Sequence, residues 1–359
     1  MLIIGCDYHP SGQQVFGIDT ESGEVFADRW IAHTGNELEE FYSGLPAGAV
    51  VGVECSGNML WFERRLAHYG HRLRLGDAGK IRAKETRKQK HDRRDAELIA
   101  RLLREDNFPD LKWVPRLAER DQRQLLMHRH KLVRMRAQVK NQLQHIALNQ
   151  GQQKKRQLWT KAGRELLEHL QLEPWTARRR DDLLRWLDLL NRDCESLERE
   201  VEQAAEARAV LMTHPGVGPV ISLAFVLTIG SIERFQRGRE LVSYLGLNPS
   251  EDSSGERRRL GGISKQGSSF MRLLLIQGAQ TAVRGDEDLR RQYRRLASKK
   301  HRAVAKVMVA RKLAVRMFWM LKTRKTHAEL VRTRGSSSHP GVGKTDCLNE
   351  RPASPRIQP

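Results

Sequence analysis

The N-terminal part of the chain divides into short apolar runs separated by polar turns. An apolar run covers residues 2–6 and ends at Asp7, and residues 14–31 hold two alternating runs around the turn sequence Glu21-Ser22-Gly23. An apolar run predicts a buried strand, and two alternating runs around a glycine-containing turn predict a β-hairpin. The chain is therefore expected to begin with three strands.

Helical and extended patterns then alternate along the chain. Residues 36–45 and 59–70 have helical spacing, residues 49–54 are expected to form another buried strand and residues 71–75 a further strand, and a helix follows them. The resulting order is three strands, helix, strand, helix, strand, helix. This order predicts a mixed α/β domain over residues 1–115.

The middle of the chain, residues 116–208, has the pattern of long basic helices. Residues 125–146 are helical in spacing and rich in Lys and Arg. Further on, apolar residues recur at alternating steps of four and three: Leu183, Leu187, Leu190, Cys194, Leu197, Val201 and Ala204. This is the a/d spacing of a coiled coil. The spacing is compatible both with a helical hairpin within one chain and with pairing of two subunits.

A third region, residues 209–328, is expected to be a mostly helical domain. It opens with HPGVGP, a tight turn between helices that resembles a helix-hairpin-helix, and continues into a Gly- and Ser-rich loop over residues 247–269. Two helices are expected after this loop, the later one basic and amphipathic. Residues 329–359 are rich in Ser, Pro and Gly, so a disordered tail is expected there.

Charge narrows the class of partner. The chain has 359 residues, with 64 Lys and Arg against 43 Asp and Glu and a formal net charge of +21. This excess favours a polyanionic partner, with nucleic acid as the first expectation. No apolar run reaches the ~18 residues of a membrane span, so no membrane partner is expected. The four cysteines form no CxxC pair, which indicates neither a disulfide framework nor a zinc site and favours the reducing cytoplasm.

Four acidic residues stand out against this basic background. Asp7 and Glu54 each end an apolar strand, and Asp92 and Asp95 lie three residues apart at the start of a predicted helix. One interpretation of the pair on the helix is capping, because Asp there satisfies free N–H groups and the helix dipole. The other is a metal site. If the two strands are neighbours and the helix packs across their ends, the four carboxylates converge and need cations, for which Mg²⁺ (or Mn²⁺) is suited.

The chain resembles the DEDD-type insertion-sequence transposases in three acidic motifs, IIGCDYH, VGVECSGN and KHDRRDAELIARL. It also resembles their C-terminal transposase domain in the blocks HPGVGPVISLAFVLTIG and YLGLNPSEDSSGERRRLGGISKQGSSFMRLLLIQGA, so the resemblance extends over about residues 1–325. The resemblance implies an RNase H-like, RuvC-like fold for the N-terminal domain. It also implies a metal site made of four ligands, namely Asp7, Glu54, Asp92 and Asp95.

The resemblance implies a serine nucleophile as well. The family has a serine just before a glycine in the loop that follows the HPGVGP turn, and Ser254 precedes Gly255 in this chain. Ser253 is the adjacent competitor, which spacing does not exclude. Nearby cations are suited to neutralise the attacked phosphate: Arg257, Arg258, Arg259 and Lys265.

Two glycines of the HPGVGP turn are further candidates for nucleic-acid contact. At Gly216 and Gly218 the missing side chain lets backbone N–H groups approach a phosphate. The same residues also suit a plain turn between helices. Within the resembled family, contact with DNA or RNA is the preferred interpretation.

These features together predict a DNA transposase or recombinase of an insertion sequence. The resemblance implies DNA cleavage and strand exchange guided by a structured non-coding RNA. The expected partners are donor and target DNA, that guide RNA and further copies of the chain in a dimer or tetramer, located in the bacterial cytoplasm and at the nucleoid when bound to DNA. Two other functions stay open: a metal-dependent, junction-resolving nuclease without a covalent intermediate, and a non-catalytic nucleic-acid-binding protein.

Overall fold

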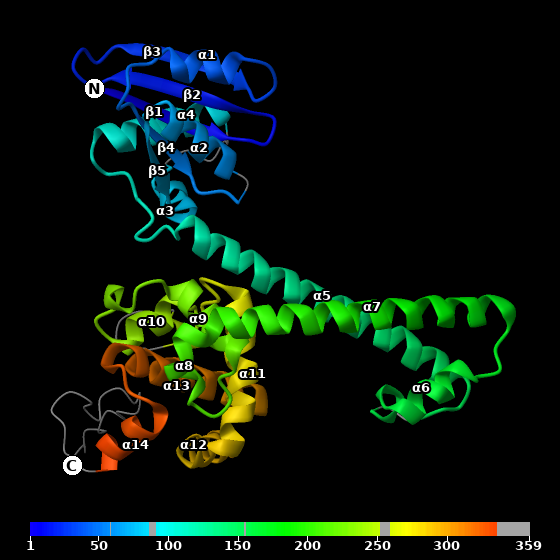
Figure 1. Ribbon diagram of the computed structural model, residues 1–359. Coiled ribbons are helices and arrows are strands. Elements are labelled where there is room, and N and C mark those ends of the chain that lie inside the picture. Colours follow the sequence, from blue (N-terminus) through cyan, green and yellow to red (C-terminus); the bar gives the residue numbers. More distant parts are fainter. Residues whose placement is uncertain (58, 86–90, 154–155, 252–258, 336–359) are drawn as a thin grey trace, which may run out of the picture. The chain divides into compact units, whose positions relative to one another are not determined.

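The N-terminal unit, Met1–Val114, is built on a five-stranded mixed sheet. The structure is a computed structural model that describes residues 1–57, 59–85, 91–153, 156–251 and 259–335 (Figure 1). In spatial order the strands are β3 Val25–Ala32, β2 Gly12–Asp19, β1 Leu2–Tyr8, β4 Val50–Glu54 and β5 Arg72–Gly76. β1 pairs antiparallel with β2 and parallel with β4. The hairpin-first, RNase H-like arrangement expected from the sequence is confirmed.

Helices cover both faces of this sheet. They are α1 Glu37–Ser43, α2 Leu60–His68, α3 Ala78–Arg82 and α4 Asp92–Arg104. Successive side chains of a strand point to opposite faces. Ile4 and Cys6 of β1 therefore belong to the core with α1 and α2, in which Phe62 is fully buried. Ile3 belongs to the core on the other face, with Ile99 of α4.

Two paired glycines let α4 approach the sheet closely. Gly5 of β1 and Gly52 of β4 are register partners. A Cβ atom at Gly5 would overlap the backbone of Ala96 and Ala100 in α4, and one at Gly52 would come within 2.6 Å of Leu103 Cδ1. Glycine at both positions therefore lets the backbone of α4 lie directly on β1 and β4.

The C-terminal unit begins at Pro115 with a pair of long helices. α5 Leu117–Asn149 and α7 Pro174–Ala205 pack against each other and are joined through the short helix α6 Lys161–Glu168 (Figure 1). Leu143 of α5 is buried with Leu183 and Leu187 of α7. The a/d seam thus packs against α5 within the chain, as expected for the helical-hairpin interpretation.

The rest of the unit is a helical domain around one apolar core. Its helices are α8 Ala209–Met212, α9 Pro219–Ile229, α10 Gly238–Tyr244, α11 Ser269–Gly285, α12 Glu287–Ala297, α13 Arg302–Thr323 and α14 His327–Gly335. α9 and α13 each contact α11. The three helices supply core residues such as Phe225, Leu275 and Phe318. The HPGVGP turn joins α8 to α9, as expected. No described helix combines the length and the apolar character that crossing a membrane requires.

Three details of this domain differ from the sequence expectation. The Gly- and Ser-rich loop contains two strands, β6 Pro249–Glu251 and β7 Leu260–Ile263, which pair antiparallel. More than two helices follow it, because Asp286 ends α11 and caps α12 through the Leu289 N–H. The tail expected from residue 329 is helical as far as Gly335. Thr326 and Glu329 explain this helix, since their reciprocal hydrogen bonds form a capping box; residues 336–359 lie outside the described residues.

Candidate functional site

Asp7, one residue before the end of β1, and Glu54, the last residue of β4, lie in adjacent parallel strands on the same face of the sheet. The register pairs Cys6 of β1 with Val53 of β4, so Asp7 and Glu54 follow at the same level. Each lies two residues after the glycine on which α4 packs, and residues two apart in a strand share a face. The expectation that the two strands are neighbours is therefore confirmed.

Helix α4 brings Asp92 to this edge. Asp92 is the first helical residue, one turn before Ala96, whose backbone lies against Gly5. The N-cap is His91, whose ring accepts a hydrogen bond from the Arg93 N–H. Asp92 thus does not serve as the N-cap, although its charge still complements the helix dipole. The capping interpretation of Asp92 is corrected in that respect.

His9 joins the two carboxylates. Its Nε2 lies 3.2 Å from Asp7 Oδ2 and 3.5 Å from Asp92 Oδ2. One ligand atom from each of the three residues lies within 4.8 Å of the others. The imidazole was not singled out from the sequence, yet a signal existed: in Asp7-Tyr8-His9 the acid and the histidine are two residues apart at a strand end, where alternation gives them one side.

Glu54 and Asp95 lie on β4 and α4, the same elements that border this group. Among the described residues, however, this group of possible metal ligands contains only Asp7, His9 and Asp92. Glu54 faces Arg82 of α3, whose guanidinium lies 3.9 Å from Glu54 Oε1. Asp95 is half-buried in the same turn of α4 as Asp92. The structure therefore brings together Asp7 and Asp92 from the predicted set, and adds His9.

The donor set fits a divalent cation. Two carboxylates within a few ångströms repel each other unless a proton or a cation lies between them. Asp7 is largely shielded, with 16% of its side chain exposed, whereas Asp92 is 48% exposed and accessible to a ligand from solvent. Carboxylate oxygens suit Mg²⁺ and Mn²⁺, and an imidazole nitrogen is compatible with the latter.

The HPGVGP turn has a packing role of its own. Gly216 has φ +86°, and a Cβ there would overlap the backbone of Gly278 in α11 and come within 2.6 Å of the Ala282 nitrogen. The turn conformation and this close contact both require glycine. Gly218 is exposed at the N-terminus of α9, and a Cβ there would meet nothing within 4 Å. Contact of either glycine with a phosphate stays a prediction.

The predicted serine region is described only at its borders. Ser254, the competing Ser253, Arg257 and Arg258 lie outside the described residues. β6 and β7 pair antiparallel on either side of them, with Glu251 opposite Leu260. Arg259 is exposed beside β7. Lys265 is exposed with φ +57°, and its backbone N–H donates to the Gly246 carbonyl.

Two protein-family models match the chain. The model described as "Transposase IS116/IS110/IS902 family" matches residues 208–294. A DEDD transposase model of the IS110 type, described as "Transposase", matches residues 4–150. The first covers the HPGVGP turn and the β6–β7 hairpin, and the second covers the sheet that carries Asp7, His9 and Asp92.

Curated relatives agree with these matches. The chain is 29% identical over 338 residues to a "Probable family 20 transposase" of Pseudomonas aeruginosa, which covers 90% of this chain and 97% of the relative. It is 30% identical over 291 residues to the "Transposase for insertion sequence element IS1111A" of Coxiella burnetii, covering 79% and 78%. A transposase for the element IS1328 of Yersinia enterocolitica is 27% identical over 303 residues, covering 81% of this chain and 88% of the relative.

Proposed function

The chain belongs to the IS110/IS1111 family of insertion-sequence transposases, and we propose that it exchanges DNA strands through a phosphoserine intermediate under RNA guidance. The chain is a DNA transposase with a DEDD-type nuclease domain. The observation that supports metal-dependent phosphoryl transfer is the meeting of Asp7, His9 and Asp92 at the carboxyl end of β1; the serine and the guide RNA rest on the family resemblance. Acidic side chains that meet at a strand end repel each other unless a cation lies between them. A cation at this position is suited to phosphate chemistry.

We propose that Asp7 and Asp92 hold Mg²⁺ or Mn²⁺, with Glu54 and Asp95 as the remaining members of the acidic set. When bound, the ion supplies positive charge to the phosphate oxygens in the transition state. His9 orients the two carboxylates by contacting one oxygen of each. Arg82 neutralises the charge of Glu54 while no cation is bound. The close packing of α4 on Gly5 holds Asp92 at the level of Asp7.

The proposed nucleophile is Ser254. Its Oγ attacks the phosphorus of the scissile phosphodiester while a base takes the hydroxyl proton. An O–P bond to the serine forms, the P–O bond to the neighbouring deoxyribose breaks, and the departing oxygen takes up a proton. Rejoining is the reverse, with the hydroxyl of the other strand as attacker. Arg259 and Lys265, exposed beside the hairpin, are suited to neutralise the phosphate.

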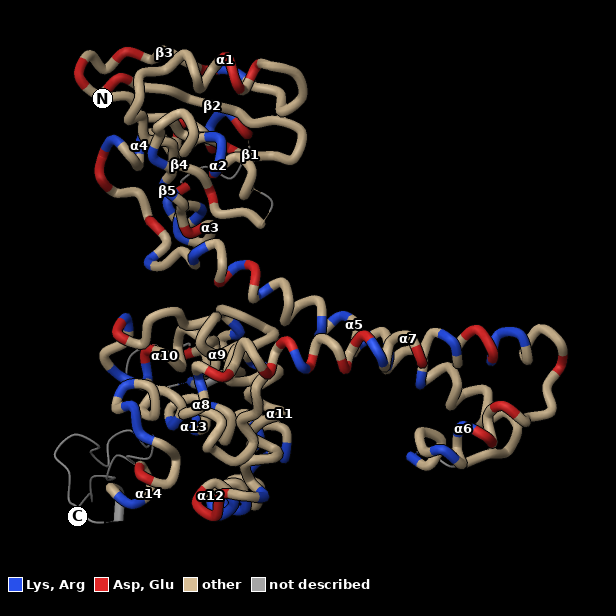
Figure 2. The backbone as a smooth tube through the Cα atoms, in the orientation of Figure 1, with Lys and Arg blue, Asp and Glu red and all other residues tan. Residues whose placement is uncertain are grey.

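We propose a guide RNA and further copies of the chain as partners. Lys and Arg recur along α5, where Lys131 and Arg134 are exposed (Figure 2), so α5 is suited to follow a phosphate backbone. Exposed apolar side chains on α7 support self-association: Trp175, Trp186 and Leu189 are 82%, 54% and 49% exposed. Spacings of 11 and 14 residues place all three on one face of the helix.

A trapping experiment tests the reaction type. Purified transposase with its guide RNA is incubated with Mg²⁺ and a nicked suicide DNA that releases a short fragment after cleavage, so that rejoining is blocked. The proposal expects a protein–DNA adduct that survives denaturing electrophoresis. Cleaved DNA without any adduct would instead identify a metal-dependent, junction-resolving nuclease, and bound but intact DNA would identify a non-catalytic binding protein.

A further inference from the structure

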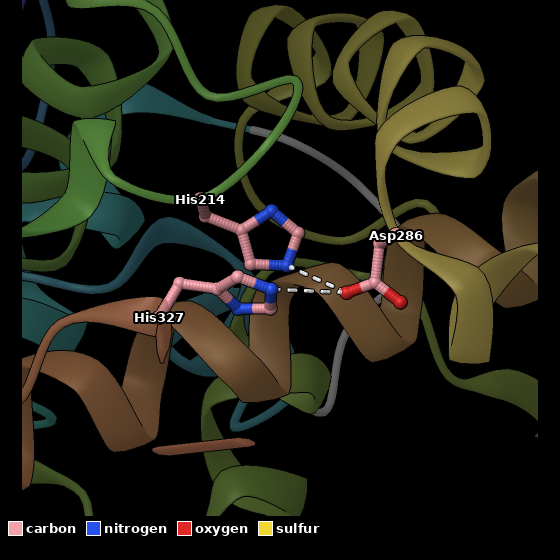
Figure 3. A group of neighbouring side chains, drawn as sticks. All are labelled: His214, Asp286 and His327. Atoms are coloured by element: carbon pink, nitrogen blue, oxygen red, sulfur yellow. Dashed lines mark ion pairs between the residues drawn. The ribbon is translucent and has the colours of Figure 1, made fainter. Parts of the chain in front are cut away.

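A second group of metal-ligating side chains lies in the C-terminal unit, and none of its members was singled out from the sequence. His214 lies in the turn after α8, Asp286 caps α12, and His327 is the first residue of α14 (Figure 3). One ligand atom from each residue lies within 4.8 Å of the others. The His214 and Asp286 side chains are 0% and 4% exposed, and that of His327 is 16% exposed.

The ring of His214 is oriented as a ligand. Its Nδ1 lies 2.7 Å from the carbonyl oxygen of Pro215, and only a protonated nitrogen bonds a carbonyl. Because Nδ1 carries the proton, Nε2 is the nitrogen with the free lone pair in the neutral ring. Nε2 is fully buried without a hydrogen-bond partner. Metal-bound histidines in proteins commonly donate their other ring N–H to a carbonyl in this way.

The unprotonated nitrogen faces an oxygen that is also an acceptor. His214 Nε2 lies 3.8 Å from Asp286 Oδ2, and His327 Nε2 lies 3.3 Å from the same oxygen. The other carboxylate oxygen accepts the Leu289 N–H at 2.8 Å, so Oδ2 is turned toward the two rings. Oδ2 accepts a hydrogen bond from Arg316 with one lone pair, and its second lone pair and that of His214 Nε2 are suited to share a cation.

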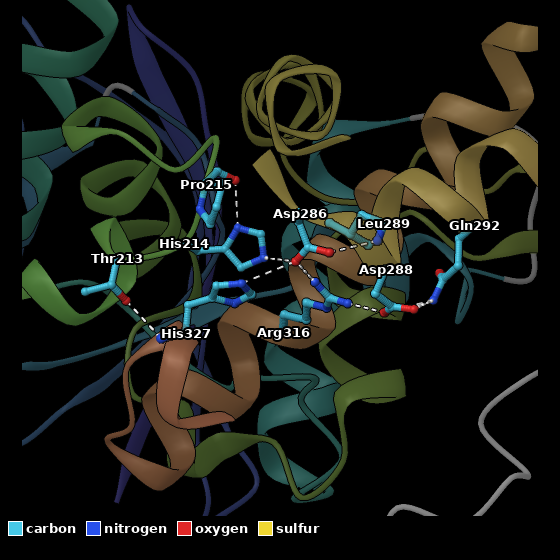
Figure 4. Close-up of polar contacts among 9 residues, drawn as sticks. All are labelled: Thr213, His214, Pro215, Asp286, Asp288, Leu289, Gln292, Arg316 and His327. Carbon is cyan, nitrogen blue, oxygen red and sulfur yellow. Dashed lines mark hydrogen bonds and ion pairs between the residues drawn. The ribbon is translucent and has the colours of Figure 1, made fainter. Parts of the chain in front are cut away.

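The charged residues around the site do not fully neutralise Asp286. Arg316 donates to Asp286 and to Asp288, and Asp288 also accepts from Gln292 (Figure 4). Asp286 and Asp288 together carry two negative charges against the one positive charge of Arg316. Because Arg316 is shared between the two acids, it only partly compensates Asp286.

We propose that His214, Asp286 and His327 bind Zn²⁺. Two imidazole nitrogens and one carboxylate oxygen form a three-ligand zinc set with a fourth position for water or another ligand. Zn–N bonds of about 2.0–2.1 Å put neighbouring ligand atoms of a tetrahedral site about 3.3 Å apart. The 3.3 Å between His327 Nε2 and Asp286 Oδ2 has this value. The 3.8 Å between His214 Nε2 and the same oxygen is longer, and a small rotation of the side chains would close the difference.

The zinc joins three segments that are distant in sequence. It connects the HPGVGP turn, the start of α12 and the start of α14, where the His327 N–H already donates to Thr213 Oγ1 at 3.0 Å. The main effect is structural: α14 is held against the turn that carries Gly216 and Gly218. The site does not depend on the proposed strand-exchange reaction, because none of its residues belongs to the acidic set.

The test is zinc binding by the full-length, chelator-stripped protein, measured by competition with a chromophoric chelator and by thermal unfolding with Zn²⁺ or Mg²⁺. His327→Ala and His327→Gln remove a ligand at the edge of the domain. His9→Ala separates this site from the acidic one, and exposed His128 on α5 gives the matched control His128→Ala. Circular dichroism checks that each variant is folded.

Both wild type and His128→Ala are expected to bind zinc and to melt at a higher temperature with Zn²⁺ than with Mg²⁺. Both His327 variants are expected to bind the zinc ion of this site at least roughly a hundredfold more weakly, and to lose the zinc-dependent rise in melting temperature. His9→Ala keeps both. Equal zinc affinity and an equal rise in the His327 variants would overturn the site, as would a rise that only His9→Ala abolishes. Wild type without zinc-dependent stabilisation would overturn it too.

Discussion

The backbone carbonyl of Ala96 occupies the space that a side chain on Gly5 would need. Together with the contact at Gly52, this contact sets how deeply α4 lies on the sheet, and with it the position of Asp92 relative to Asp7. The acidic site therefore depends on a residue that carries no functional group.

Replacement of Gly5 by alanine is expected to displace α4 and to destabilise the N-terminal unit by about 1–3 kcal/mol or more, the usual cost of overpacking. Activity should fall further than the fraction of folded protein, because Asp92 moves with the helix. Gly57→Ala is the control, since a Cβ at Gly57 would meet nothing within 4 Å. Urea unfolding of both variants gives the comparison, and equal stability would contradict the packing argument.

Asp7→Asn and Asp92→Asn are each expected to abolish Mg²⁺-dependent recombination while the protein stays folded and keeps most of its affinity for nucleic acid. Loss of one carboxylate removes a cation ligand and also relieves repulsion between the acids, so the metal-free melting temperature should stay level or rise. Asp193→Asn, at an exposed position of α7, controls for the change in net charge. Full activity in either site variant would refute the metal-site assignment.

His9→Gln tests the residue that the structure adds to the site. Without the imidazole that contacts both carboxylates, the Mg²⁺ concentration for half-maximal recombination should rise by roughly tenfold, as expected when a residue that orients ligands is lost. His68→Gln, at an exposed position of α2, should leave it unchanged. A Mg²⁺ dependence in His9→Gln equal to that of wild type would remove His9 from the site.

Ser254→Ala is expected to bind RNA and DNA normally but to form no protein–DNA adduct, whereas Ser253→Ala should retain exchange. The argument is chemical: Gly255 gives the phosphate access to Ser254, while neighbouring arginines stay protonated and cannot act as the base. Suicide substrates, denaturing gels and peptide mass spectrometry locate the adduct. Its location on Ser253 or Tyr244, or its absence altogether, would refute the assignment.

Guide-free protein is expected to bind duplex DNA with little sequence preference and with an affinity that falls steeply with salt, because phosphate contacts dominate. Replacement of Lys131 and Arg134 together by alanine should lower the slope of log affinity against log salt by roughly two if both contact phosphates. Fluorescence anisotropy over a salt series measures this slope. Tight binding of one sequence by RNA-free protein would overturn guidance by RNA.

The sequence by itself determined the succession of strands and helices along the N-terminal domain, the hairpin at the start and the family. Alternation in β2 and β3 and the apolar runs of β1 and β4 report burial on the faces of a sheet, which is a local property of the chain. The motif around Asp7, Glu54, Asp92 and Asp95 likewise located the acidic edge. The a/d seam of α7 was visible too, although its partner α5 became known only from the packing.

Only the tertiary structure decided which side chains meet. Periodicity places Asp92 and Asp95 on one helix face, but the depth of α4, set by Gly5 and Gly52, determines that Asp92 reaches Asp7 and His9. His214, Asp286 and His327 come from three segments far apart in the sequence, and their spacing matches no metal motif. Convergence of residues distant in sequence depends on side-chain direction and core packing, and neither has a periodic signal along the chain.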